Sequence, residues 1–273
     1  MTVSIRLALP AAVAVALAGA ATGANAQETI RLGTEGAYPP FNYTNAAGEL
    51  EGFEIDMGNA LCERMGVECE WVAQDWDGII PALLQGRYDA IIAAMNITEE
   101  RQETIDFTQD YVSMPVIFVG PADDPEFQAV TTVDELAAAL EDEVVGVQEA
   151  TIFQTFVETA LPDVELRTYG TQEQLNLDLV SGRVDAGLAD SFAWKDFLES
   201  EEGADYAQFG PGLTGEDFPV LGRGMGIGLR PGDDELRARF DEALCELAED
   251  GTLSELSMEW FEEDISLPCR REG

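Results

Sequence analysis

The stretch Leu83-Leu84-Gln85-Gly86-Arg87-Tyr88-Asp89-Ala90-Ile91-Ile92 returns in related form as Leu179-Val180-Ser181-Gly182-Arg183-Val184-Asp185-Ala186-Gly187-Leu188. Leu, Gly, Arg, Asp and Ala occur at identical spacing in both copies. Each copy has the features of a helix end, a capping glycine turn and a buried strand. A unit that occurs twice predicts two lobes of similar α/β build, with chance similarity of a common turn as the alternative.

Along the chain from Glu28 onward, short runs rich in Val and Ile alternate with helical segments. The expected strands are 30–33, 69–73, 90–95, 144–147, 164–167, 184–189 and 224–229. The expected helices are 54–65, 76–84, 133–140, 152–160, 172–180, 234–249 and 253–261. This alternation predicts mostly parallel sheets covered by helices, with binding sites at the carboxyl ends of the strands.

The charge balance excludes several classes of function. The 273 residues include 14 Lys and Arg against 54 Asp and Glu, a formal net charge of −40. Nucleic acids and anionic lipids bind through positive patches, so we expect neither as a partner. His is absent and Lys195 is the only lysine, which argues against His-based catalysis, His metal sites and most Schiff-base chemistry. The acidic surface suits a saline habitat, and steering of a cationic ligand is a second interpretation.

The first 26 residues have the pattern of a secretory signal. Arg6 precedes the apolar run 7–21, and Ala24-Asn25-Ala26 offers the small residues that signal peptidase accepts. The run is shorter than the about 20 residues that a membrane-spanning helix needs. We therefore expect residues 1–26 to be a signal peptide and the mature chain to begin near Gln27.

The four cysteines of an exported chain favour disulfides. Sequence alone allows three pairings of Cys62, Cys69, Cys245 and Cys269. Cys62 and Cys69 flank a helix end and a strand start, a local spacing that favours their pairing and leaves Cys245 for Cys269. Neither pair has the CxxC form of a zinc or redox site, so we expect structural disulfides, no metal and no cofactor.

Four motifs resemble one family closely. They are Gly33-Thr34-Glu35-Gly36-Ala37-Tyr38-Pro39-Pro40-Phe41, Gly52-Phe53-Glu54-Ile55-Asp56, Trp76-Asp77-Gly78-Ile79-Ile80-Pro81-Ala82-Leu83 and Asn96-Ile97-Thr98-Glu99-Glu100-Arg101. Over nearly all of the mature chain, the sequence resembles periplasmic amino-acid-binding proteins of ABC importers, of the lysine/arginine/ornithine and histidine type. The stretches 76–81, 93–95 and 146–148 also resemble the octopine and nopaline (opine) branch.

The resemblance implies a type II periplasmic-binding-protein fold, α/β with two lobes joined by two crossover strands. Residues 28–115 plus 213–269 would form the first lobe, and residues 116–212 the second. The crossings would lie near 113–116 and 211–219, and the lobes would close on an amino acid or opine. The resemblance also implies a periplasmic monomer that delivers its ligand to a membrane permease.

The resemblance assigns the two charges of an amino acid to opposite lobes. Arg101 has the position of the α-carboxylate ligand, where a guanidinium forms two parallel hydrogen bonds. Asp190 has the position of the α-ammonium acceptor, and a helix cap for residues 191–198 is its structural alternative. Tyr38 and Trp76 match the rings that enclose the ligand side chain, with core filling as the alternative, and Glu35 matches the acidic residue at its distal cation.

Departures from the family pattern concern the pocket floor. The serine-rich turn of the family is Ala93-Ala94-Met95-Asn96 here, which removes hydroxyl donors and enlarges the floor. In the second lobe, Thr151 and Ile152 begin a helix whose N–H groups face an anionic carboxylate. With Met114 near the first crossing, these changes make an opine a plausible ligand.

Two other functional classes remain as alternatives. A cyclohexadienyl-dehydratase-like enzyme would share the implied fold and compartment, but it needs a positioned acid or base besides the ligand clamps. A ligand-sensing module for a signalling partner is the other alternative, although the sequence shows no attached domain.

Overall fold

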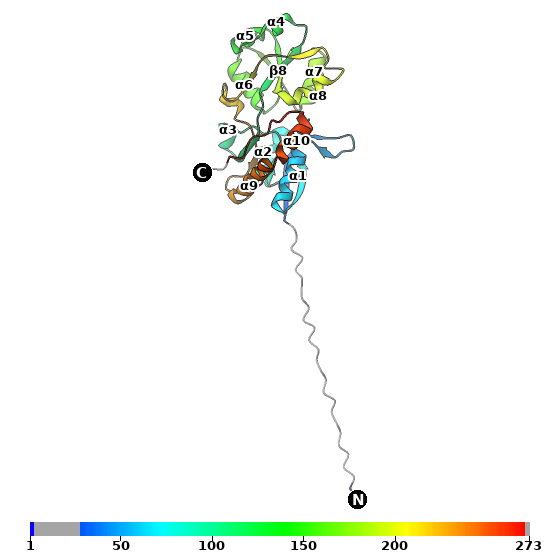
Figure 1. Cartoon of the computed structure of the whole chain (residues 1–273). Coiled ribbons are helices and arrows are strands. Elements are labelled where there is room, and N and C mark those ends of the chain that lie inside the picture. The colour runs from blue at the N-terminus through cyan, green and yellow to red at the C-terminus, as the bar shows by residue number, and fades with distance from the viewer. Residues whose placement is uncertain (3–27, 271–273) are drawn as a thin grey trace.

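The computed structural model describes residues 1–2 and 28–270 of the chain (Figure 1). The expected signal peptide, apart from Met1 and Thr2, lies outside the described residues. Figure 1 shows two lobes: α4 to α8 surround β8 in one, and α1, α2, α9 and α10 lie in the other. The two-lobed α/β architecture expected from the repeat is therefore confirmed.

The first lobe contains a sheet with strand order β5-β1-β6-β13-β7. Its strands are β1 (Thr29–Thr34), β5 (Glu68–Ala73), β6 (Ala90–Ile91), β7 (Asp106–Val112) and β13 (Met225–Leu229). β1 runs parallel to β5 and β6, whereas β13 runs antiparallel to β6 and β7. The helices in this part of the chain are α1 (Phe53–Met65), the 3₁₀ turn Trp76–Gly78, α2 (Ile79–Leu84), α3 (Glu99–Gln102), the 3₁₀ turn Pro219–Leu221, α9 (Asp234–Asp250) and α10 (Thr252–Phe261).

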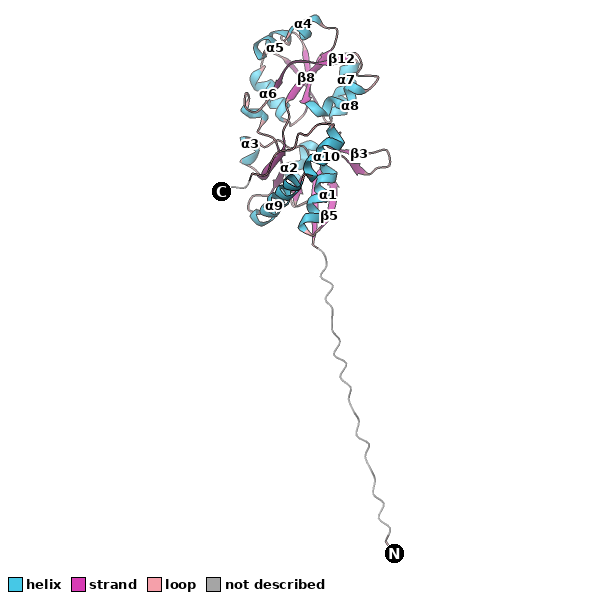
Figure 2. Cartoon of the chain, viewed as in Figure 1, coloured by secondary structure: helices cyan, strands magenta, loops and turns pink. Residues whose placement is uncertain are grey.

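The second lobe repeats this plan with the order β10-β9-β11-β8-β12. Its strands are β8 (Val116–Pro121), β9 (Val144–Gln148), β10 (Glu165–Tyr169), β11 (Ala186–Asp190) and β12 (Tyr206–Leu213). β9 runs parallel to β10 and β11, and β8 runs antiparallel to β11 and β12. Its helices are α4 (Pro125–Ala129), α5 (Val133–Ala139), α6 (Ile152–Ala160), α7 (Gln172–Val180), the 3₁₀ turn Ser191–Trp194 and α8 (Lys195–Glu199). Figure 2 shows helices flanking the main sheet of each lobe.

The chain crosses between the sheets twice. It leaves the first sheet after Val112, enters the second at Val116, and returns after Leu213. Leu213 pairs with Val116, so the two crossings begin side by side. Each sheet therefore contains both parallel and antiparallel pairs. The antiparallel strand, β13 in the first sheet and β8 in the second, follows a crossing between the lobes and not a βαβ connection.

The repeated aspartates make the same contacts in both lobes. Asp89 Oδ2 accepts a hydrogen bond from the Arg31 backbone N–H at 3.0 Å, and Asp185 Oδ2 accepts one from Val144 N–H at 2.8 Å. The backbone N–H groups of Asp89 and Asp185 donate back to the carbonyls of Arg31 and Val144. The repeat therefore ties the start of each returning strand to its parallel neighbour.

The repeated glycines give a test of this equivalence. Gly86 and Gly182 have φ values of 74° and 65°, and no atom lies within 4 Å of a Cβ built on either. Replacing each with Ala should cost about 1–2 kcal/mol, because the left-handed backbone is the only penalty. Calorimetry should show Tm reductions of similar size for both variants. Gly170→Ala, whose Cβ would meet only the Gln174 side chain, is the control; a similar reduction there would contradict the interpretation.

Several elements depart from the expected boundaries. The strand expected over 90–95 ends at Ile91, because the chain turns where Ala94 adopts a φ of 49°. The strands β7, β8 and β12 and a small sheet of β2 (Ala37–Tyr38), β3 (Asn42–Thr44) and β4 (Leu50–Glu51) were not expected. β12 contains Gly210-Pro211-Gly212, which reads as a strand breaker in isolation.

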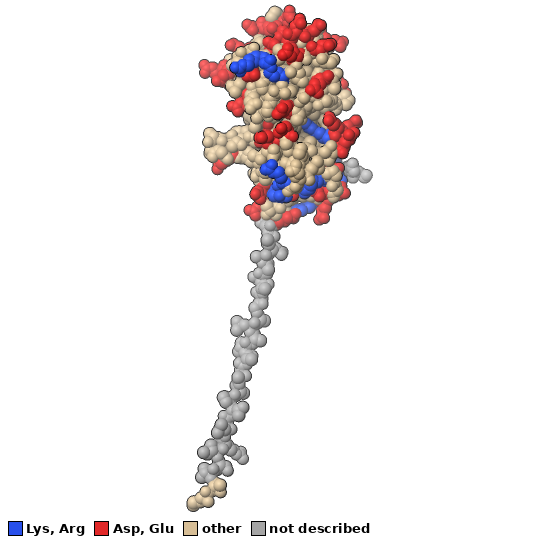
Figure 3. Space-filling view, turned by 180° about the vertical axis from the view of Figure 1, so that it is seen from behind, with Lys and Arg blue, Asp and Glu red and all other residues tan. Residues whose placement is uncertain are grey.

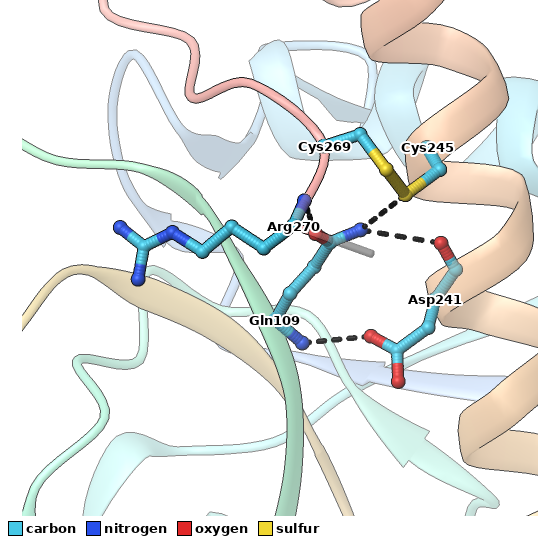
Figure 4. The surroundings of a disulfide bond; sticks show 5 residues. All are labelled: Gln109, Asp241, Cys245, Cys269 and Arg270. Carbon is cyan, nitrogen blue, oxygen red and sulfur yellow. Dashed lines mark hydrogen bonds between the residues drawn. A yellow bond between two sulfur atoms is a disulfide. The ribbon is translucent and has the colours of Figure 1, made fainter. Parts of the chain in front are cut away.

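The structure forms the two expected disulfides, Cys62–Cys69 and Cys245–Cys269. The second pins the C-terminal tail next to β7 (Figure 4), where Gln109 Oε1 accepts from Arg270 N–H at 2.7 Å. Gln109 Nε2 also donates to the Asp241 carbonyl at 3.2 Å. The Arg270 guanidinium lies 3.0 Å from the buried carboxylate of Asp110, so the disulfide holds a counter-charge beside this group.

Carboxylates dominate the view in Figure 3, where they crowd the end of the molecule that α4 and α5 occupy in Figure 1. In the same view, Lys and Arg side chains appear as a few separate groups.

No helix within residues 28–270 has the length and apolar character needed to cross a membrane.

Candidate functional site

A cavity lies where the two lobes meet. Ten residues singled out from the sequence line it: Glu35, Tyr38, Trp76, Ala93, Ala94, Asn96, Arg101, Thr151, Ile152 and Asp190. Gln148 and Phe153 complete the lining. The cavity therefore combines loops at the carboxyl ends of strands in both sheets, as expected for an α/β fold.

Arg101 is held by its own short helix. Thr98 caps α3 by accepting a hydrogen bond from Arg101 N–H at 3.2 Å, and Arg101 Nη1 donates to the Asn96 carbonyl at 2.8 Å. The guanidinium carbon lies 5.2 Å from the centroid of the Trp76 ring, within cation–π range. Burial lowers the pKa of Arg101 to about 10, so the side chain stays charged at neutral pH.

Asp190 is the last residue of β11 and is 2% exposed. Its Oδ2 accepts a hydrogen bond from the Tyr38 hydroxyl of the other lobe at 3.0 Å. It occupies the N-cap position of the 3₁₀ turn that follows but makes no side-chain cap hydrogen bond there. Burial raises the pKa of Asp190 to about 7, against the opposing effects of the Tyr38 hydrogen bond and the Arg101 charge.

Glu35 follows β1 and is buried at the lobe interface. Its Oε1 accepts a hydrogen bond of 2.6 Å from Gln148 Nε2, which comes from the second lobe. Burial raises the pKa of Glu35 to about 7, and the Gln148 hydrogen bond limits this rise. The cavity thus holds two carboxyl groups that titrate near neutrality.

A third bond between the lobes comes from Trp76, whose Nε1 donates to the Ala150 carbonyl at 3.0 Å. Ala150 has a φ of 57° and precedes Thr151, the N-cap of α6. The Thr151 hydroxyl donates to the Gln148 carbonyl at 2.7 Å, which fixes the turn after β9. Residues that line the cavity therefore also join the two lobes.

Glu54 supports the cavity from behind, fully buried on α1. It accepts hydrogen bonds from Asn42 Nδ2 and Ala94 N–H, both at 2.7 Å, and from the Tyr111 hydroxyl. Asn42 in turn accepts from Gly36 N–H at 2.8 Å. One carboxyl group thus fixes the turns that carry Glu35 and Ala93; burial raises the pKa of Glu54.

Two residues singled out from the sequence lie outside the cavity. Met95 is fully buried in a hydrophobic cluster beside α2, which also includes the cavity residues Trp76 and Ala93. Met114 lines a separate groove beside the crossings. Gln148 appeared in a sequence motif but was not predicted as a site residue, and Phe153 gave no signal beyond the apolar face of α6. No group of three or more Cys, Asp and Glu side chains in the described part of the chain could hold a metal.

Comparison with known proteins identifies the family of this chain. Residues 30–263 match the model of bacterial extracellular solute-binding proteins, family 3. The L-arginine-binding protein of Pseudomonas aeruginosa is 38% identical, with 95% of this chain and 98% of that protein aligned. The octopine-binding periplasmic protein of Rhizobium meliloti is 35% identical, with coverages of 88% and 92%.

Among solved structures, a periplasmic His/Glu/Gln/Arg/opine family-binding protein from Silicibacter pomeroyi in complex with lysine is 38% identical. It has a TM-score of 0.75 and covers 87% of this chain and 99% of its own. The chain therefore belongs to family 3 of the bacterial extracellular solute-binding proteins, as the sequence motifs indicated.

The two carboxyl groups predict a pH dependence of binding. Glu35 and Asp190 have pKa values of about 7, so both become protonated as the pH falls through neutrality. A cationic ligand favours the ionised forms, so its affinity should fall roughly tenfold or more between pH 8 and pH 6. Titration calorimetry with arginine, which stays cationic over this range, measures the effect.

Glu35→Gln should flatten part of this dependence, because one titrating group is removed. The effect of the two carboxyl groups on the free energy of unfolding has the opposite pH dependence to their effect on binding. Their protonated forms stabilise the folded protein, so this contribution is present at low pH and is lost as the pH rises through about 7. An affinity for arginine that rises on acidification would contradict the interpretation.

Proposed function

We propose that this protein binds a cationic amino acid of the arginine, lysine or ornithine type in the periplasm and delivers it to the membrane permease of an ABC importer. The charge pattern of the cavity carries this proposal. Among the lining residues, Glu35 and Asp190 are acidic and Arg101 is basic. A cationic amino acid has the complementary set, two positive groups and one carboxylate.

The proposed orientation follows from these charges. Arg101 binds the α-carboxylate through its guanidinium, Asp190 accepts from the α-ammonium group, and Glu35 meets the cation at the end of the side chain. Tyr38 and Trp76 line the same cavity and provide ring surface for the aliphatic stem. The α-carboxylate and the α-ammonium group thus contact different lobes, which favours closure when ligand binds.

The division of the chain into moving parts is also part of the proposal. Residues 28–115 plus 213–269 form one body, and residues 116–212 form the other. The crossings at 113–116 and 211–219 act as the hinge. Sheet membership supports this division, because each sheet draws its strands from one of the two sets.

The proposal includes export to the periplasm through a cleaved signal peptide, residues 1–26. The proposal also includes action as a monomer without cofactor. Transport as opposed to catalysis or signalling is supported by relatives that are themselves named as binding proteins.

An opine is the second candidate ligand, supported by the small side chains of Ala93 and Ala94 and by the octopine-binding relative. A second carboxylate on the α-nitrogen, however, would lie beside Asp190. Among the described residues, Arg101 is the only basic one that lines the cavity, and the adjoining groove contains Glu99, Glu100 and Glu158. The charges therefore favour the free amino acid.

Thermal unfolding of the mature protein tests the proposal. We expect arginine, lysine or ornithine at 100 times its dissociation constant to raise the Tm by about 5–10 °C. Histidine, glutamine, octopine, nopaline and prephenate complete the panel. Turnover of prephenate would support the dehydratase alternative, and no shift with any amino acid or opine would overturn the proposal.

Arg101→Ala should weaken binding by at least about 100-fold, because it leaves the ligand carboxylate buried without a counter-charge. Arg87→Ala is the matched control, since Arg87 lies on the surface and donates to Gln74 outside the cavity. Calorimetric titration of both variants measures the difference. Equal affinity of the two variants would show that Arg101 does not bind the ligand.

A further inference from the structure

Gln148 occupies an unusual place for an amide, at the carboxyl end of β9 and 2% exposed. Its Nε2 donates to Glu35 Oε1 at 2.6 Å and to the Gly170 carbonyl at 3.2 Å. The first bond connects the lobes, and the second holds the side chain to its own lobe. Gln148 therefore has a fixed position at the Glu35 end of the cavity.

The orientation of the amide follows from these partners. Glu35 and the Gly170 carbonyl are both acceptors, so the side-chain nitrogen faces them and the oxygen faces elsewhere. No described residue donates to Gln148 Oε1 or to Glu35 Oε2. Both residues line the cavity, one from each lobe, and each has a side-chain oxygen that their mutual hydrogen bond does not use.

A pair of acceptors in a buried site discriminates between two kinds of cation. A guanidinium is planar and carries five N–H donors in a rigid fork, so it donates to two neighbouring oxygens at once. An ammonium group is a compact, strongly hydrated point charge, and it loses more hydration on burial for the same two contacts. The amide oxygen of Gln148 adds an acceptor without adding a second negative charge.

We infer that Gln148 is a specificity-determining residue, which together with Glu35 selects a guanidinium over an ammonium group and so arginine over lysine. This inference rests on the proposed function and narrows its ligand class. Gln148 acts on the ligand through its oxygen and on Glu35 through its nitrogen. The same residue thus recognises the side-chain end and positions the carboxylate beside it.

The test compares two ligands on two variants at pH 7.5. Gln148→Met keeps the length of the side chain and removes both hydrogen-bonding groups. We expect its dissociation constant for arginine to rise about tenfold or more and that for lysine by less than about threefold, since the lost bond is specific to the guanidinium. Gln208→Met, at an exposed position on β12, is the matched control and should change neither value.

The ratio of the two affinities separates recognition from a structural effect. Loss of the bond between Gln148 and Glu35 changes lobe closure for every ligand equally, so equal losses for arginine and lysine would overturn the inference. A wild-type protein that binds lysine as tightly as arginine would also overturn it while leaving the proposed function intact. A wild-type protein that binds neither would instead refute the proposed function. If Gln148→Met does not fold, Gln148→Asn, which retracts the amide by one methylene, should show the same fall in arginine preference.

Discussion

Hydrogen bonds between buried carboxyl groups of one lobe and donors of the other are the interactions on which the arrangement of this molecule depends. Glu35 accepts from Gln148, and Asp190 accepts from Tyr38, in each case across the lobe boundary. A buried carboxylate without such partners costs several kcal/mol. The two lobes therefore meet at the groups whose burial is most expensive, and any cation that neutralises them strengthens the same contact.

The distribution of charge differs between the surface and the cavity. The chain has 54 acidic and 14 basic residues, and its acidic excess lies mainly in contact with solvent. Salt screens such exposed charges over about 8 Å at physiological ionic strength. Salt screens the charged groups of the cavity, Glu35, Arg101 and Asp190, less than it screens exposed charges. We therefore expect the balance among these three charges to decide which ligand charges the cavity favours. The net charge of the chain affects its solubility and the rate at which it meets a charged ligand.

The sequence predicted the parts of the fold that local chemistry specifies. The glycine turns at Gly86 and Gly182 and the aspartates that follow them require little more than their own segment, and both copies are present. β8 and β12 depend on each other across the crossings, so neither is specified by its own residues. The antiparallel insertion of β13 between β6 and β7 is likewise a long-range choice that alternation of elements does not encode.

The cavity shows the same division between local and long-range information. Arg101 and Asp190 were predicted from the family resemblance, and the structure places them in α3 and at the end of β11, where both line the cavity. Gln148 lies at the end of a strand, where its local sequence does not differ from that of an ordinary strand residue. Its hydrogen bond to Glu35, 113 positions earlier in the chain, is the feature that marks it as a residue of the cavity. Met95, which was predicted from the same resemblance, follows the left-handed residue Ala94 and is buried in a hydrophobic cluster.

The position of β13 also constrains the order in which the chain assembles. The second sheet is contiguous in sequence and has all of its strands once Leu213 has emerged. The first sheet lacks an internal strand until Leu229 has emerged, and its β7 edge gains the tail only when Cys269 reaches Cys245. During synthesis or translocation from the N-terminus, the later part of the chain can therefore finish folding before the earlier part, and the last residues to arrive complete the lobe that began first.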